Sequence, residues 1–331
     1  RTLSQWVKFA NSLRLRLAIR VSMSAPDLAR AEVAKAMDAT AGGVLESADE
    51  TVAVSTESGY KNPLGTVNEG WGEVFMGATM ESVLVGYNDP RLIKYYSKAE
   101  GGDIKDEKGN LIIAERNKIA GTYKGVPQGT GVTVKDENRY RLHSKSTITK
   151  QTDAILMTAA EVWFLRAEAA LRGFTSENVK DCYEKGITVS CQQWGVNVGD
   201  YLTSDATPSD YVDAFEAKYD VKALIKVTPK WDGGASPEEQ LERILTQKWI
   251  ACYPEGYEAW TEQRRTGYPQ LFKVFVNNSG GAIDTNIRIR RLPYPSDIQK
   301  NNPTQYSALK KALGGEDNGG TRLWWDTGRN F

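Results

Sequence analysis

The sequence has little histidine and little cysteine, with one histidine and three cysteines in 331 residues. The single histidine, His143, excludes sites built from several histidines, such as the zinc-binding His-Glu-x-x-His helix. Cys182 and Cys191 fall in one predicted helix, too far apart along its axis to form a disulfide. Cys252 can pair with one of them only if the fold brings the two together, so buried free thiols are favoured. No metal and no cofactor are expected.

Also lacking are a long apolar run and an excess of charge of either sign. No run of eighteen apolar residues occurs, so no segment is predicted to span a membrane. Lys+Arg and Asp+Glu both number 42, so the net charge is zero. This balance argues against nucleic acid as the main partner, because phosphate binding needs clustered basic residues. The densest basic run, Arg288, Arg290 and Arg291, alternates with apolar residues and predicts a strand with one charged face.

Apolar residues recur at helical spacing in three parts of the chain. Two stripes between 153 and 194 are separated by Gly173 and resemble one tetratricopeptide unit, and a related pair follows at 238–265. We therefore predict a mainly α fold of tetratricopeptide-like helix pairs with inserted loops and a few short strands. The expected helical scaffold covers 1–40, 153–195 and 236–265, and the expected loop-rich insertions cover 42–150 and 195–235.

Several strings occur in a specific order along nearly the whole chain. They are the helix-like opening at 6–20, Asn88-Asp89-Pro90-Arg91, the run 248–253 that leads into Arg264-Arg265-Thr266-Gly267-Tyr268-Pro269, then Arg291-Leu292-Pro293-Tyr294-Pro295, and Leu323-Trp324-Trp325-Asp326. In this order the series resembles the SusD/RagB family, and especially its SusD-like branch. The resemblance implies a nutrient-binding lipoprotein on the outer membrane of Gram-negative bacteria. Such proteins capture glycans or related oligomers and pair with a SusC-like TonB-dependent transporter.

The resemblance also bears on the start of the chain and on its localisation. The chain begins at Arg1 without an initiator Met, and it is in a helical pattern by Trp6. We interpret residues 1–331 as a single SusD-like domain that lacks the family's N-terminal segment. The lipid anchor that would hold the protein at the cell surface is expected on that segment.

A search for catalytic residues yields little. Glu255, Glu258 and Glu262 come closest to the carboxylate pair that a glycoside hydrolase needs. Glu258 and Glu262 lie one turn apart on the same predicted helix, with Arg264 and Arg265 just beyond. We predict that these carboxylates neutralise buried arginines, and that the protein is not an enzyme.

Aromatic side chains in loops are the best candidates for sugar contacts, because the C–H faces of sugar rings stack on aromatic rings. Five tryptophans fall on predicted helices, Trp249 and Trp260 among them, and are expected to pack internally. Trp324 and Trp325 are expected to dock the C-terminus. The segment from Tyr60 to Trp71 is expected to be a loop that opens with a turn at Asn62-Pro63-Leu64-Gly65. The predicted ligand-binding residues are Tyr60, Asn62, Asn68, Trp71, Tyr123 and Trp231.

The expected affinity is modest. Covering about 100 Å² of an aromatic face contributes about 2.5 kcal/mol, against about 4.1 kcal/mol for a millimolar dissociation constant. The ligand is thus expected to be an oligosaccharide, a polysaccharide or a peptide bound at high-micromolar to millimolar strength. Two alternatives stay open: a tetratricopeptide-type scaffold that binds proteins or peptides, and a glycoside hydrolase. Aromatics gathered in an exposed cleft would favour capture, and two facing carboxylates would favour the enzyme.

Overall fold

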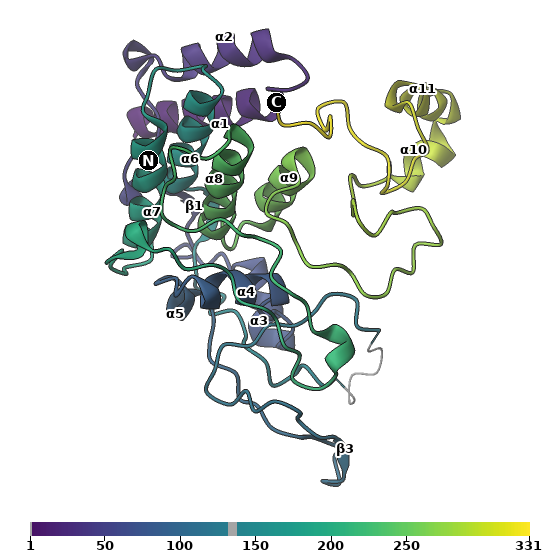
Figure 1. Cartoon of the computed structure of the whole chain (residues 1–331). Helices are drawn as coiled ribbons and strands as arrows, with labels where there is room; N and C mark the ends of the chain where they lie inside the picture. The colour runs from purple at the N-terminus through teal and green to yellow at the C-terminus, as the bar shows by residue number, and fades with distance from the viewer. Residues whose placement is uncertain (1, 132–137) are drawn as a thin grey trace.

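The computed structural model describes residues 2–131 and 138–331, and it is mainly helical (Figure 1). The helices are α1 (Leu3–Arg20), α2 (Pro26–Ala36), α3 (Pro63–Trp71), α4 (Ala78–Gly86), α5 (Leu92–Tyr95), α6 (Ala159–Leu171), α7 (Val179–Gln193), α8 (Pro237–Ala251), α9 (Gly256–Thr266), α10 (Ser296–Asn301) and α11 (Pro303–Leu313). The strands are β1 (Val52–Val54), β2 (Ile104–Lys105), β3 (Leu111–Ile113) and β4 (Ala154–Met157). The predicted fold class, helix pairs with a few short strands, is confirmed.

Three helix pairs form the scaffold. Helix α6 packs against α7, α8 and α1, and α1 packs in turn against α2. Figure 1 shows these helices side by side, with α9 next to α8. Local sequence sets where they begin: Thr158 caps α6, Asn178 caps α7, and Ser236 forms a capping box with Glu239 ahead of α8. The scaffold is therefore encoded by periodicity and caps that can be read locally.

Buried charges cross the interfaces between the scaffold helices. Arg16 of α1 donates to Glu161 of α6 at 2.7 Å, and Arg20 lies 2.5 Å from Glu258 of α9. Lys248 of α8 lies 3.2 Å from Glu258. Each carboxylate is buried and faces a cation from another helix, so the charges satisfy one another away from water. The predicted role of Glu258, neutralising arginines within the helical stack, is confirmed.

A second layer lies beside the scaffold and contains α3, α4 and α5 (Figure 1). Strand β1 pairs antiparallel with β4, and β2 pairs antiparallel with β3 in a projecting hairpin. The supposed turn at 62–65 is instead the start of α3. Asn62 caps the helix by accepting from the Leu64 N–H at 3.0 Å, and Pro63 occupies the first helical position. Asn-Pro serves a turn and a helix start equally well, which explains the wrong expectation.

The Asn-Asp-Pro-Arg string forms a buried junction between the two layers. Both Asp89 and Arg91 are buried, and Arg91 Nη2 lies 2.6 Å from Asp89 Oδ2. Arg91 also donates to Ser190 of α7 at 3.0 Å and to Gln247 of α8 at 2.8 Å. Tyr201, from the 195–235 insertion, donates to Asp89 at 2.7 Å. One ion pair thus joins α5, two scaffold helices and the insertion.

The chain after α9 is mostly irregular until α10 and α11 (Figure 1). The strand predicted around Arg288, Arg290 and Arg291 is wrong, because no strand occurs there in the described chain. Arg288 has a left-handed φ of 63°, which breaks the alternation a strand requires. Arg290 pairs with Asp326.

Other sequence expectations have mixed outcomes. The three cysteines are buried free thiols, as predicted. Trp325 packs as expected, with the Arg264 guanidinium 4.9 Å from the centre of its ring. Trp324 is 68% exposed and does not dock. Within the described residues, every helix is too short or too polar to cross a bilayer.

Candidate functional site

Two adjoining hollows lie at the corner where α8 meets α9. The larger has a volume of about 600 Å³ and lies between α9 and the 271–289 segment. The smaller, of about 240 Å³, lies between the same corner and residues 64–80. Trp249, Gly256 and Ala259 line both hollows, so the two adjoin along this corner. We call the two together the aromatic groove.

One face of α9 forms the floor of the larger hollow. Gly256, Ala259, Trp260 and Gln263 line it at helical spacing i, i+3, i+4 and i+7. The two small residues leave room beside the indole. Trp260 is held in place because its Nε1 donates to the Ile289 carbonyl at 3.0 Å and the Arg264 guanidinium lies 3.7 Å from the ring centre. The groove therefore presents a fixed aromatic ring.

The opposite wall of the larger hollow mixes apolar side chains, such as Val274, Val276 and Ile283, with amides and hydroxyls. Asn277 donates to the Ile283 carbonyl at 2.8 Å and to the Thr285 hydroxyl at 2.9 Å, which fixes the loop. Asn278 and Asp284 also line the hollow and are exposed. This wall offers hydrogen-bond donors and acceptors opposite an aromatic floor, an arrangement that suits a polar ligand with an apolar face.

The smaller hollow is lined by aromatic residues from both layers. Tyr253 stacks on Tyr95 at 4.3 Å between ring centres, and its hydroxyl lies 2.6 Å from the Ser146 hydroxyl. Phe75 and Leu64 line the side that faces α3. This end of the groove is rigid, because its rings are packed against one another.

Trp71, expected in a loop, is the last residue of α3 and is 70% exposed. It lies seven residues after Leu64 and therefore on the same face of the helix, the face that borders the smaller hollow. Tyr60 precedes α3 and is 40% exposed. These two aromatic side chains are free to meet a ligand.

The two predicted amides are used inside the protein. Asn62 caps α3 and donates to the Thr152 carbonyl at 3.0 Å. Asn68 donates to the carbonyls of Ser146 and Ile148 at 2.8 and 2.9 Å. Both side chains position α3, and through it Trp71.

The remaining two predicted residues lie away from α3. Tyr123 is half-buried against the main core. Trp231 packs against Tyr183 with ring centres 5.1 Å apart, and it also borders a separate hollow of about 480 Å³. The structure therefore does not bring the six predicted residues together.

Trp249 and Trp260 were expected only to pack internally, and this was wrong in part. Trp249 packs against the main core and also lines both hollows, and Trp260 lines the larger one. The available sequence signal was the pair of small residues, Gly256 and Ala259, on the helix face that carries Trp260. Small residues beside a large aromatic at helical spacing leave a hollow unless another element fills it.

Glu255 is the carboxylate of the smaller hollow. Burial, together with the charges of Glu161 and Glu258, raises the pKa of Glu255 to about 7, although Arg16 lies 3.5 Å away. Asp284 lines the larger hollow, so neither hollow holds two carboxylates among the described residues. The described residues also contain no cluster of three metal-ligating side chains.

We expect Glu255→Gln to raise the free energy of unfolding at pH 8 by up to about 3 kcal/mol, and to change it little at pH 4. The folded pKa of about 7 exceeds the ordinary 4.5, so the advantage of the neutral acid is present below 4.5 and is lost as the pH rises through 7. Glutamine stays neutral throughout. Urea unfolding at both pH values measures the effect, with the exposed Glu57→Gln as control. A less stable variant at pH 8 would show that contact with Arg16 outweighs burial.

Comparison with known families finds one match that covers nearly the whole chain. A family model described as "SusD-like: Susd and RagB outer membrane lipoprotein" matches residues 1–326. No curated protein matches the chain at a significant level.

Several solved structures of SusD homologues are similar to this chain over nearly its whole length. A SusD homologue from Bacteroides vulgatus is 52% identical with a TM-score of 0.90, and the match covers 100% of this chain and 64% of that one. A chitin-binding SusD homologue from Flavobacterium johnsoniae is 37% identical with a TM-score of 0.87, covering 98% and 64%. A SusD homologue from Bacteroides thetaiotaomicron is 34% identical with a TM-score of 0.86, covering 98% and 66%. The chain thus spans slightly less than two thirds of these relatives.

Proposed function

The chain belongs to the SusD-like family of outer membrane lipoproteins, and on this premise we propose that it captures glycans at the cell surface, with the aromatic groove as the binding site. The observation that carries the proposal is the groove itself, in which Trp249 and Trp260 lie opposite a wall that mixes apolar side chains with amides and hydroxyls. Sugar rings need both chemistries, because their C–H faces stack on aromatic rings while their hydroxyls exchange hydrogen bonds. The chitin-binding relative supports a glycan as the ligand class.

Capture without cleavage is part of the proposal. Two facing carboxylates are the minimum for glycoside hydrolysis in most families. Among the described lining, the two carboxylates of the groove lie in different hollows, Glu255 in the smaller and Asp284 in the larger. Native gels that contain a panel of polysaccharides, run beside an assay for released reducing sugar, test this directly. Retardation by a glycan without sugar release supports capture. Sugar release would overturn the non-catalytic part, and no retardation by any glycan would overturn the proposal.

We also propose that Trp71 extends the binding surface beyond the smaller hollow. Trp71→Ala is expected to weaken glycan binding about tenfold, because one exposed indole face contributes about 1–2.5 kcal/mol when a sugar covers it. Affinity gels with the retarding glycan give the dissociation constants. Trp324→Ala is the matched control, since Trp324 is 68% exposed against 70% for Trp71 and does not line the groove. Equal affinities of both variants would exclude Trp71 from the site. Ligand contact by Tyr60 or Trp231 stays a prediction. Any effect on binding of Asn62, Asn68 or Tyr123 is expected to come from their packing inside the protein.

Delivery to a SusC-like TonB-dependent transporter and a lipid anchor complete the proposal. Both rest on the family, whose members are described as outer membrane lipoproteins. Purification of the tagged full-length protein from outer membranes, with identification of what accompanies it, tests the transporter. If the protein is purified without such a transporter, the proposal of glycan capture stands and the proposal of delivery fails.

A further inference from the structure

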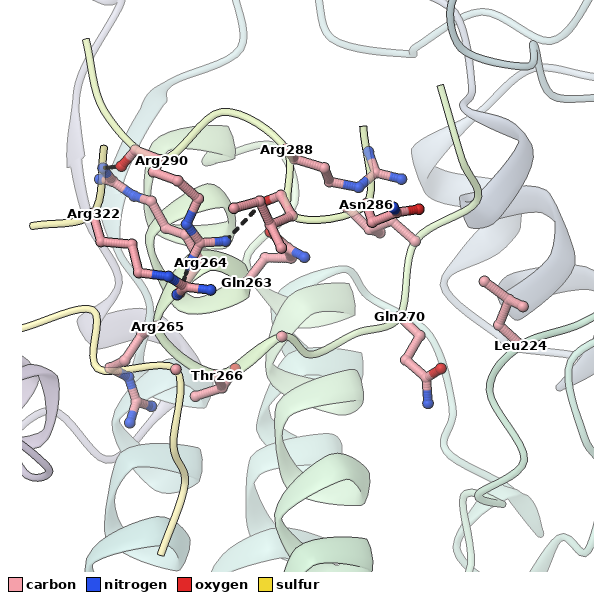
Figure 2. A pocket seen from close by; sticks show the side chains of 14 residues that line it. Leu224, Gln263, Arg264, Arg265, Thr266, Gln270, Asn286, Arg288, Arg290 and Arg322 are labelled. Atoms are coloured by element: carbon pink, nitrogen blue, oxygen red, sulfur yellow. Dashed lines mark hydrogen bonds between the residues drawn. The ribbon is translucent and has the colours of Figure 1, made fainter. Parts of the chain in front are cut away.

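Another cavity, of about 310 Å³, lies beside the larger hollow and is strongly basic (Figure 2). We call it the arginine pocket. Five arginines line it, and its described lining contains no Asp or Glu. The five are Arg264, Arg265, Arg288, Arg290 and Arg322. Figure 2 shows Arg264, Arg290 and Arg322 gathered at one end, Arg288 with Asn286 at the other, and Gln263 between them.

The positive charge of the arginine pocket is only partly balanced. Arg265 is neutralised by Glu168 and Glu262, each 2.7 Å away. Arg290 and Arg322 share a single carboxylate, Asp326, at 2.6 and 2.5 Å.

The other two arginines, Arg264 and Arg288, form no ion pair with any described residue. Arg288 donates instead to the Gln128 amide oxygen at 3.0 Å and to the Phe272 carbonyl. The pocket therefore holds an excess of positive charge that only neutral groups solvate.

Arg264 is the most constrained of these cations. Its guanidinium lies between the rings of Trp260 and Trp325, at 3.7 and 4.9 Å from their centres. It donates to the Arg290 carbonyl at 2.6 Å, and its buried Nε has no partner among the described residues. Burial and the charges of Arg20 and Arg290 lower the pKa of Arg264 to about 10, which still leaves it protonated at neutral pH. An anion in the pocket would relieve the repulsion among these cations.

The arginine pocket adjoins the larger hollow of the aromatic groove. Gln263, Leu271 and Arg288 line both cavities. A sugar stacked in the groove therefore lies next to the arginines, and a charged substituent on that sugar needs to reach only across this shared wall.

From this geometry we propose that the arginine pocket binds the carboxylate or sulfate of an acidic glycan held in the aromatic groove. The proposal rests on the proposed function and narrows it from glycans to anionic glycans. Arginine suits this ligand, because its planar fork donates two parallel hydrogen bonds to the oxygens of a carboxylate or sulfate. The alternative occupant is an acidic segment of the transporter. It is disfavoured by the wall that the pocket shares with the groove.

The test uses one polysaccharide backbone in three charge states. Chondroitin sulfate carries sulfate and carboxylate, its desulfated form carries carboxylate alone, and the desulfated, carboxyl-reduced form is neutral. Polygalacturonate and its methyl ester give a second backbone. A charged form that binds at least tenfold more tightly than its neutral counterpart supports the proposal and identifies the anion. Equal binding of charged and neutral forms would overturn it while the proposed function stands. No binding by these or any neutral glycan would overturn both.

Substitutions assign the preference to this pocket. Arg288→Gln is expected to weaken binding of the charged form about tenfold. Arg322→Gln, at a side chain that is 39% exposed, is expected to weaken it severalfold and to leave binding of the neutral form unchanged. Arg30→Gln removes the same charge from the exposed face of α2 and is the control. Melting temperatures establish that each variant is folded. A preference for the charged form that survives both pocket substitutions would overturn the proposal. The proposal would also be overturned if the pocket variants kept their glycan binding but no longer co-purified with the transporter. That result would mean that the pocket binds a carboxylate of the transporter.

Discussion

Replacing Arg265 with methionine is expected to lower the free energy of unfolding by about 3–5 kcal/mol. The Arg265 guanidinium is buried and donates to Glu168 at 2.8 and 2.7 Å and to Glu262 at 3.1 and 2.7 Å. Methionine fills similar space but leaves two carboxylates away from water with one cation fewer. Arg172 still contacts Glu168 and Lys248 still contacts Glu262, so the scaffold is expected to be weakened, not abolished.

The matched control is Arg14→Met, at a half-exposed arginine that pairs with Glu32 at 2.6 Å. Exposed pairs contribute about 1 kcal/mol or less, so this substitution is expected to change stability little. Urea unfolding of both variants gives the comparison. Similar losses for the two variants would show that burial does not set the strength of these pairs.

The pH dependence gives an independent check on the Arg265 variant. Arg265 and Lys248 hold the pKa of Glu262 well below its ordinary value despite burial, and Arg265 and Arg172 lower that of Glu168. A lowered folded pKa gives stability that is present above the unfolded value of 4.5 and lost as the pH falls towards the folded one. The deficit of the variant is therefore expected to shrink as the pH falls below about 4.5. A deficit independent of pH would point to lost packing as its cause.

The helical scaffold was predictable because its signals are local. Apolar spacing and the Ser236 capping box define α8, and the spacing of Glu258 and Glu262 ahead of two arginines indicated buried pairing. Even the Asn-Asp-Pro-Arg string could be recognised as a family feature. In each case a few adjacent residues carry enough information to define the element.

The groove could not be predicted in the same way, because distant segments form it. Trp249 and Trp260 are on helices, and half-buried helical tryptophans look like core residues until the packing shows which side is open. The polar wall at 277–285 lacks periodicity and gave no signal at all. For Trp71 the helix was missed, although the prediction that its ring is accessible agrees with its 70% exposure.

The arginine pocket depends even more on tertiary structure. Arg264 and Arg322 lie far apart in sequence, and Arg288, which has a left-handed φ, comes from a third segment. The zero net charge of the chain concealed a local excess of one sign. Composition limits the classes of partner for a whole surface, but it does not describe a single pocket.

Replacing Asp89 with asparagine is expected to destabilise the protein by about 3–5 kcal/mol, through the junction that joins the two layers. Asp89 accepts from the Arg91 side chain at 2.9 and 2.6 Å, from the Arg91 backbone N–H at 2.9 Å and from the Tyr201 hydroxyl at 2.7 Å. Asparagine keeps the shape but removes the charge, so the buried guanidinium of Arg91 is left without a carboxylate. Its amide also directs a donor towards groups that are themselves donors.

The junction makes a regional prediction as well as a global one. Tyr201 belongs to the 195–235 insertion, and Gln247 of α8 donates to its hydroxyl at 2.8 Å, so the insertion is tied to the scaffold through Asp89. In the Asp89→Asn variant, hydrogen exchange and proteolysis are expected to increase first within 195–235. Asp210→Asn, at an exposed pair with Lys222, is the control and is expected to change stability little. If hydrogen exchange in the variant is no faster within 195–235 than in the rest of the chain, the insertion is held by its other contacts. The ion pair would then stabilise only α5 and the scaffold.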